Sequence, residues 1–215
     1  MKSITCYCCE NPAVGQGDHV PPINIFPKGL FSNTKPIIVP SCMEHNEKKS
    51  SSDEYLKFVL ASSSEFTPSD VLGSTVRGLM RHVINDSKSL PSFGIERTGQ
   101  KVFIEGSAPV NFKHLNESLE KVARGVYYHH SNGKKLLGRL VVFPIFLGIH
   151  PLANPEERKR LKIIESHTMQ DMEEYEMLGE FKEFFSYQVI ENSEILVINM
   201  NFYATKTVSV MHAKA

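Results

Sequence analysis

The chain has 215 residues, 41% of them hydrophobic and 22% charged, and its 24 Lys and Arg balance its 24 Asp and Glu to a formal net charge of +0. This composition is typical of a globular protein with a buried core, and the balanced charge excludes nucleic-acid binding that depends on an overall basic excess. The longest apolar run, 140–149, is interrupted by Pro144, and the N-terminus lacks the apolar segment of a signal peptide, so we expect a soluble, cytoplasmic protein without membrane contact.

The N-terminal part of the chain combines two short strands with a long helix. Pro21 and Pro40 each end a short strand-like stretch, because proline cannot donate the N–H that a strand ladder requires. Apolar residues then recur at helical spacing, and the serines of 62–64 indicate a linker. The linker predicts a first domain at 1–62 and a second domain at 66–215. The elements expected in the first domain are strands at 18–20 and 37–39 and a helix at 42–60.

The second part of the chain has the pattern of an α+β domain without a nucleotide-binding glycine loop. Asn154 followed by Pro155 is a good helix start, because proline fits the first helical turn. Residues from Phe185 onward alternate between apolar and polar, which is typical of antiparallel strands. The expected elements are helices at 67–85, 111–127 and 154–164, strands at 101–105 and 139–149, and three antiparallel strands between 181 and 211.

The cysteines gather near the N-terminus and form two half-sites for a metal ion. Cys6 and Cys9 form a Cys-x-x-Cys, and Cys42 and His45 form a Cys-x-x-His. Cysteines in such pairs are more often metal ligands than members of a disulfide framework, which would spread them along the chain. Because zinc takes thiolate and imidazole ligands in a tetrahedron, we expect a structural zinc in a treble-clef-like layout. Cys8 is an alternative to Cys6 or Cys9, but it lacks their usual ligand spacing.

Several residues around these half-sites match a known signature. They are Asp18-His19-Val20-x-Pro22, Val39-Pro40-Ser41-Cys42-x-x-His45-Asn46, Ser50 and Asp53-Glu54-Tyr55. Together they resemble the signature of the HNH endonucleases, which have the ββα-metal, or His-Me finger, fold. The resemblance implies an α+β chain in which an N-terminal zinc-stapled ββα-metal module precedes an α+β domain that ends in an antiparallel sheet.

The resemblance also implies a role for each residue of the site. His19 would be the general base of phosphodiester hydrolysis, and an unperturbed imidazole pKa of about 6.5 suits that task. Asp18 and Asn46 would hold a catalytic Mg²⁺ or Mn²⁺, and Ser50 stands where the family often carries a further ligand. The substrate would be nucleic acid, DNA in preference to RNA, and the products would carry a 5′-phosphate and a 3′-hydroxyl.

Lysines beside this site have two interpretations. Lys48 and Lys49 on the helix, and Lys35 in the loop before it, either contact phosphates or belong to a solvated surface. The second domain is expected to select the substrate or a partner, with a partner protein or a second copy of the chain as candidates. An alternative function is a zinc-stapled module with a decayed active site, which binds nucleic acid or protein without cutting. A third is a host-defence effector whose second domain restrains the nuclease.

Overall fold

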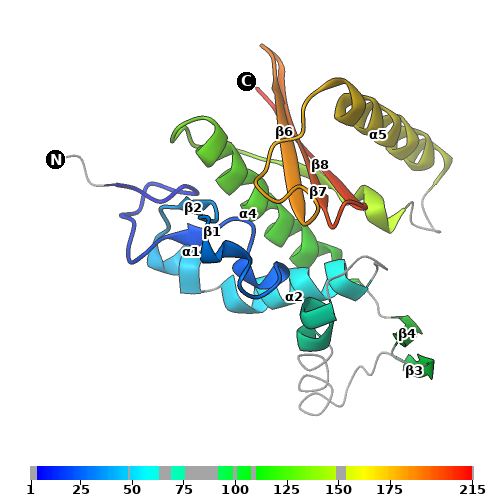
Figure 1. The fold of residues 1–215 in the computed structure, drawn as a ribbon. Coiled ribbons are helices and arrows are strands. Elements are labelled where there is room, and N and C mark those ends of the chain that lie inside the picture. The colour runs from blue at the N-terminus through cyan, green and yellow to red at the C-terminus, as the bar shows by residue number, and fades with distance from the viewer. Residues whose placement is uncertain are drawn as a thin grey trace.

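The computed structural model describes residues 4–47, 49–62, 69–75, 92–98, 101–107, 110–148 and 154–214. For 47, 49–51, 92–98 and 101–107 it describes the backbone alone. The chain is a mixture of helices and sheets that ends in an antiparallel sheet, which confirms that part of the expected fold (Figure 1). Among the described helices, none has the length and apolar character needed to cross a membrane.

The largest sheet has four antiparallel strands in the order β5-β8-β7-β6. The strands are β5 (Val141–Phe143), β6 (Phe185–Glu191), β7 (Ile195–Phe202) and β8 (Lys206–Ala213). The last three confirm the strands expected from the alternation of the C-terminal residues. The strand expected at 139–149 is wrong in its extent, because β5 ends before Pro144 and a 3-10 helix, η3 (Ile145–Leu147), follows it.

Helix α4 (Phe112–His130) lies against the apolar face of this sheet and contacts β5, β6 and β7. Its start confirms the sequence prediction, because the Asn111 side chain accepts a hydrogen bond from the backbone N–H of His114 at 3.1 Å. The buried residues of α4 recur at helical spacing and include Leu115, Leu119, Val122 and Val126. One face of this helix therefore forms the centre of the core.

The N-terminal segment packs on α4 through its own small elements. Its strands β1 (Asp18–His19) and β2 (Ile38–Val39) pair antiparallel, and two 3-10 helices, η1 (Ile23–Ile25) and η2 (Leu30–Ser32), lie between them. Helices α1 (Met43–Glu47) and α2 (Lys49–Ser62) follow. They cover the range of the expected 42–60 helix, with residue 48 outside the described residues.

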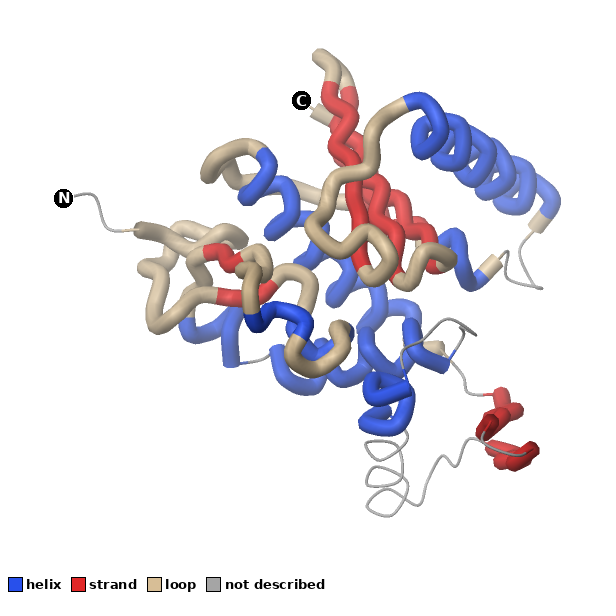
Figure 2. Tube along the Cα trace, in the orientation of Figure 1, coloured by secondary structure: helices blue, strands red, loops and turns tan. Residues whose placement is uncertain are grey.

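The N-terminal segment and the C-terminal sheet share one hydrophobic core. Buried residues from Cys6 to Val210 belong to a single cluster. The hydroxyl of Tyr203, which follows β7, donates to the carbonyl of Ile25 at 2.6 Å and so ties the two ends together. Figure 2 shows the N-terminal loops lying beside α4 and the sheet. The expected domain boundary at 63–65 lies outside the described residues.

Helix α5 (Pro155–Glu174) covers the other side of the sheet, so that the sheet lies between α4 and α5 (Figure 1). A capping box of Asn154 and Glu157 starts it, as the sequence predicted, but the helix runs ten residues beyond the expected end at 164. Strands β3 (Ser92–Thr98) and β4 (Lys101–Ser107) form a separate hairpin that includes the expected strand at 101–105. Of the helix expected at 67–85, the structure describes 69–75, which is helical.

Candidate metal centre

Cys6, Cys9, Cys42 and His45 converge on one point in the N-terminal segment. Their ligand atoms all lie within 4.8 Å of one another. The Sγ atoms of Cys9 and Cys42 are 3.8 Å apart, and the Nδ1 atom of His45 lies 3.6 Å from the Sγ atoms of Cys6 and Cys9 and 3.1 Å from that of Cys42. In a tetrahedral site with ordinary Zn–S and Zn–N bonds these edges are about 3.8 Å and about 3.5 Å. The cluster can therefore hold a metal ion such as zinc, with Nδ1 as the histidine ligand.

Local backbone geometry brings each half-site to this point. The backbone N–H of Cys8 points to the Sγ of Cys6 at 3.4 Å, as in a tight turn that aims two thiolates at one metal. The N–H of Tyr7 donates to the carbonyl of Pro40 at 2.8 Å and thereby fixes the turn beside the start of α1. Cys42 and His45 lie three residues apart at that start, so their side chains share one side of the first turn.

The position of its thiol, rather than its protonation, distinguishes Cys8 from the four candidate ligands. Burial raises the pKa of Cys8 to about 12 and that of Cys9, one of the four, to about 11, so a raised pKa does not by itself exclude a thiol as a ligand. Burial also raises the pKa of Cys42, but hydrogen bonds from the backbone and the side chain of His45 outweigh it and lower that pKa to about 6. Cys8 lies outside the cluster of four, so the alternative that it replaces Cys6 or Cys9 is not the arrangement observed.

Asp18 and His19 lie on β1, at the side of this metal centre. The Cα partner of Asp18 is Val39, which is 1% exposed, and the partner of His19 is Ile38, which is 48% exposed. Cross-strand partners share a face of the sheet, and successive residues alternate between faces. Asp18 therefore points into the protein and His19 points toward its surface.

The carboxylate of Asp18 has an internal hydrogen-bond donor. It is 3% exposed, and its Oδ2 atom accepts a hydrogen bond from the hydroxyl of Tyr7 at 3.1 Å. Burial, followed by the electrostatic effects of Cys8 and Asp18, raises the pKa of Tyr7 well above its ordinary value, so Tyr7 remains a donor. Sequence reasoning missed Tyr7, because it lies between two cysteines and belongs to no recognisable motif.

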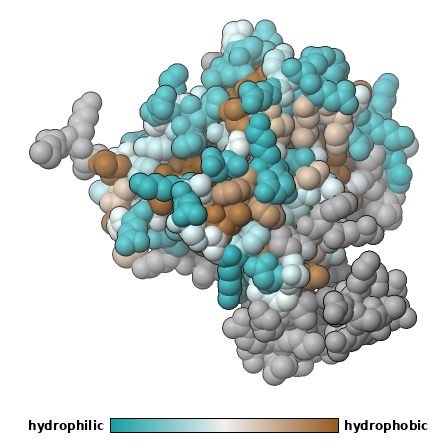
Figure 3. Space-filling model, viewed as in Figure 1, coloured by the Kyte–Doolittle hydropathy of each residue, from teal (hydrophilic) through white to brown (hydrophobic). Residues whose placement is uncertain are grey.

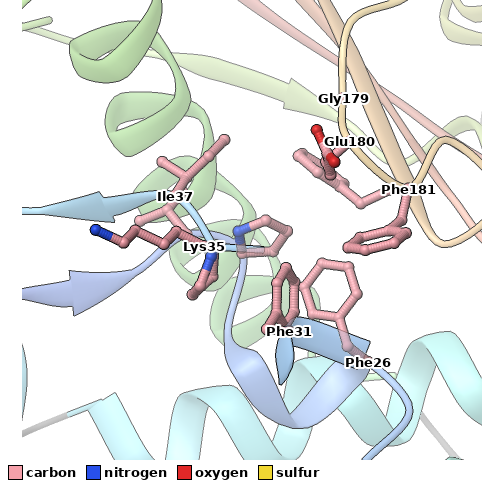
Figure 4. Close-up of a pocket in the computed structure, with 11 residues that line it drawn as sticks. Phe26, Phe31, Lys35, Ile37, Gly179, Glu180 and Phe181 are labelled. Atoms are coloured by element: carbon pink, nitrogen blue, oxygen red, sulfur yellow. The ribbon is translucent and has the colours of Figure 1, made fainter. Parts of the chain in front are cut away.

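The remaining residues of the expected catalytic site come from α1, α2 and the loop before β2. Asn46 is exposed and directly follows the ligand His45. The side chains of Lys49 and Ser50 are not described, and Lys48 lies outside the described residues. Lys35 is exposed and directs its ammonium group away from the rings of Phe31 and Phe181 (Figure 4). The assignment of Asp18, Asn46 and Ser50 to a catalytic metal, and of the three lysines to phosphates, stays a prediction.

A ring cluster lines a small pocket beside β1. The ring of Phe31 packs edge-to-face against Phe26 at 5.0 Å and against Phe181 at 5.5 Å between centroids (Figure 4). The pocket measures about 50 Å³, whereas a cavity that admits a single benzene ring measures about 150 Å³. A nucleobase does not fit it. The rings therefore connect the loop before β2 to the loop before β6. Figure 3 shows hydrophobic residues between hydrophilic ones on this face of the molecule.

Contacts from α4 and the loop after it reach the metal centre from far along the chain. The ammonium group of Lys135 donates to the carbonyl of Cys9 at 2.8 Å and pairs with Glu10 at 3.0 Å. Arg124 pairs with Glu120, one turn earlier on α4, at 2.5 Å and holds that loop by donating to the carbonyls of Leu136 and Gly138. Arg124 thus braces the loop that carries Lys135, a role that only the fold could reveal.

Comparisons of this chain with models of known protein families, with curated proteins and with solved structures found no match. The resemblance to HNH endonucleases therefore rests on the residues quoted above and on their chemistry.

Proposed function

We propose that the chain is a metal-dependent nuclease of the HNH type whose N-terminal segment is held together by a structural zinc. The observation that carries the proposal is the position of His19 on the outward face of β1, in a two-stranded hairpin that a helix follows and that lies between the two halves of the cysteine–histidine cluster in the sequence. Zinc sites with four protein ligands leave no position for substrate, so this zinc would stabilise and would not catalyse.

His19 is the proposed general base. Its half-buried imidazole shares a face of the hairpin with the exposed side chain of Ile38, and a phosphodiester backbone would reach it from that face. Proton removal from water by an imidazole requires a pKa near the working pH, which histidine provides. Asp18 and Asn46, with Ser50, are the proposed ligands of a Mg²⁺ or Mn²⁺ ion, which when bound would neutralise charge at the scissile phosphate. Lys35, Lys48 and Lys49 are proposed to bind neighbouring phosphates.

A second candidate is a binding module that does not cut. The observation that favours it is the burial of Asp18 and its hydrogen bond with Tyr7, because a catalytic metal needs this carboxylate at the same surface as the base. In that case the zinc-stapled segment would recognise nucleic acid or protein as a rigid unit, and the Asp18–Tyr7 pair would be structural.

A cleavage assay separates the two candidates. The purified protein is incubated with plasmid DNA and with single-stranded DNA and RNA, in the presence of Mg²⁺, Mn²⁺ or a chelator. We expect metal-dependent cutting that His19→Ala reduces by about 10² to 10⁴-fold, the usual contribution of a general base. Zinc content and far-ultraviolet circular dichroism should be unchanged in this variant.

His129→Ala provides a matched control, because His129 is exposed at the end of α4 and is not among the proposed catalytic residues. It should cut as fast as the wild type. If the wild type leaves every substrate intact while it retains zinc and its fold, the binding module is the better description.

A further inference from the structure

A second cavity, distinct from the pocket beside β1, lies between the first turns of α4, the β5–η3 corner and the first half of α5. It has a volume of about 180 Å³. Its walls are mostly apolar and include Phe143, Ile145, Leu161 and Ile164. An apolar cavity of about 150 Å³ in a protein core binds benzene, so this one has room for a six-membered ring with a short substituent.

Two residues with oxygen acceptors, Asn116 and the exposed Glu165, are among those that line this cavity. The Oδ1 atom of Asn116, on α4, is excluded from solvent and has no hydrogen-bond partner among the residues that the structure describes. The carboxylate of Glu165, on α5, makes no ion pair within the same described part of the chain. A buried acceptor without a partner is unfavourable, and a ligand that donates N–H groups would satisfy it. Acceptors of this kind, one of them an anion, select a cationic donor.

The cavity lies where α5 is weakly held. Of the residues of α5, all of which the structure describes, only Thr168 is buried. The sheet face beneath α5 carries the buried polar side chains of Gln188, Asn199 and Ser209, so little apolar area joins helix and sheet. Gln188 donates to the carbonyl of Asp171 at 3.3 Å, near the C-terminal end of α5. A ligand in the cavity would add contacts to the N-terminal half of α5.

We propose that this cavity binds a small cation composed of a single aromatic or heteroaromatic ring with a protonated amine or amidine substituent. The ring fills the space between the apolar walls, and the N–H groups donate to Asn116 Oδ1 and to the carboxylate of Glu165. Because the site contains residues from α4, β5, η3 and α5, occupation fastens α5 to the rest of the molecule. The proposal is independent of the nuclease activity proposed for the N-terminal segment.

Benzamidine, which is a cation at neutral pH, is the probe for this site. Titration of the full-length, zinc-loaded protein by calorimetry should give saturable one-site binding, and the amides of β5 and α5 should shift in its NMR spectrum. Benzyl alcohol, a neutral analogue, should bind more weakly, and benzoate should not bind. If benzamidine fails to bind at millimolar concentration, or if benzoate binds as well, the proposal is wrong.

Variants locate the site. Glu165→Gln keeps the shape of the side chain but removes its charge, and should weaken benzamidine binding about three- to tenfold, the range for a partly exposed charged hydrogen bond. Ile164→Phe fills the cavity and should abolish binding, with folding checked by circular dichroism. Glu173→Gln, an exposed change further along α5, should bind like the wild type. Unchanged binding in both Glu165→Gln and Ile164→Phe would place the ligand elsewhere and overturn the assignment.

Discussion

Gly125 shows how closely the N-terminal segment fits against α4. A Cβ atom at this position would lie 2.5 Å from Cγ2 of Val20, so no larger residue fits without displacing Val20, which directly follows β1. Gly125→Ala should therefore lower the free energy of unfolding by about 1–2 kcal/mol, because overpacking outweighs the helical preference for alanine. Urea denaturation measures the change.

Val20→Ala provides the control for this contact. The double variant Val20→Ala/Gly125→Ala should be less destabilised than the sum of the two single changes, because the smaller side chain removes the clash. Additive losses would mean that Gly125 is required for a reason other than its contact with Val20.

The burial of Lys206 should make the free energy of unfolding depend on pH in the alkaline range. It is buried beneath the ring of Phe146, and burial lowers the pKa of its ammonium group. Between the lowered folded pKa and the unfolded value, the unfolded chain binds more protons, so stability rises with pH in that window. The free energy of unfolding of the wild type relative to Lys206→Met should therefore increase as the pH rises toward about 10.4, the unfolded value. Guanidinium titrations measure both free energies of unfolding. If their difference stays constant or falls as the pH rises, the charge of Lys206 is not buried.

Local spacing was sufficient to identify the four residues that could hold a metal ion, but not their surroundings. Cys6, Cys9, Cys42 and His45 stand at ligand intervals that are visible in the sequence. Tyr7 and Lys135, which support Asp18 and Cys9, carry no such signal, because their roles arise only when separated segments meet. Sequence reasoning therefore identifies candidate metal ligands more readily than the residues that hydrogen-bond to those ligands and support them.

At the scale of elements, starts of helices were more predictable than the ends of elements. Asn111 and Asn154 give local capping signals, and both helices begin there. The end of α5 carries no glycine or proline, so the helix continued past 164 to Glu174. The run after Leu140 is apolar enough for a long strand, but the pairing of β5 with β8 stops at Phe143 because Pro144 lacks an N–H.

The capping box of α5 is open to a direct test. The side chain of Asn154 accepts from the N–H of Glu157 at 2.9 Å, and the Glu157 carboxylate accepts from the N–H of Asn154 at 3.0 Å. Asn154→Ala removes the first bond and should cost about 1 kcal/mol. Since α5 is mostly exposed, faster hydrogen exchange should be confined to its first turns. Ser166→Ala, an exposed change in the middle of the helix, should leave exchange there unaltered.

For the whole molecule, the shared core couples the metal centre to the C-terminal sheet. The cluster of buried residues that includes Cys6 and Cys42 also includes residues of β6, β7 and β8. The alternation and helical spacing of the sequence predicted these elements separately, but which of them meet in one core depends on long-range packing. Loss of the metal should therefore affect the stability of the sheet as well as the folding of the N-terminal segment.

Cys42→Ala tests this coupling. Zinc content measured by mass spectrometry should fall from stoichiometric to little or none, because the variant loses a ligand of a closed site. The free energy of metal binding contributes to folding, so unfolding should become easier by several kcal/mol and the protein less soluble. Cys8→Ala is the matched control and should keep its zinc, since the Cys8 thiol lies outside the cluster. If Cys42→Ala keeps all of its zinc, or if Cys8→Ala loses it, the set of ligands is different from the one proposed. The stability of the core would then not depend on a metal held by these four residues.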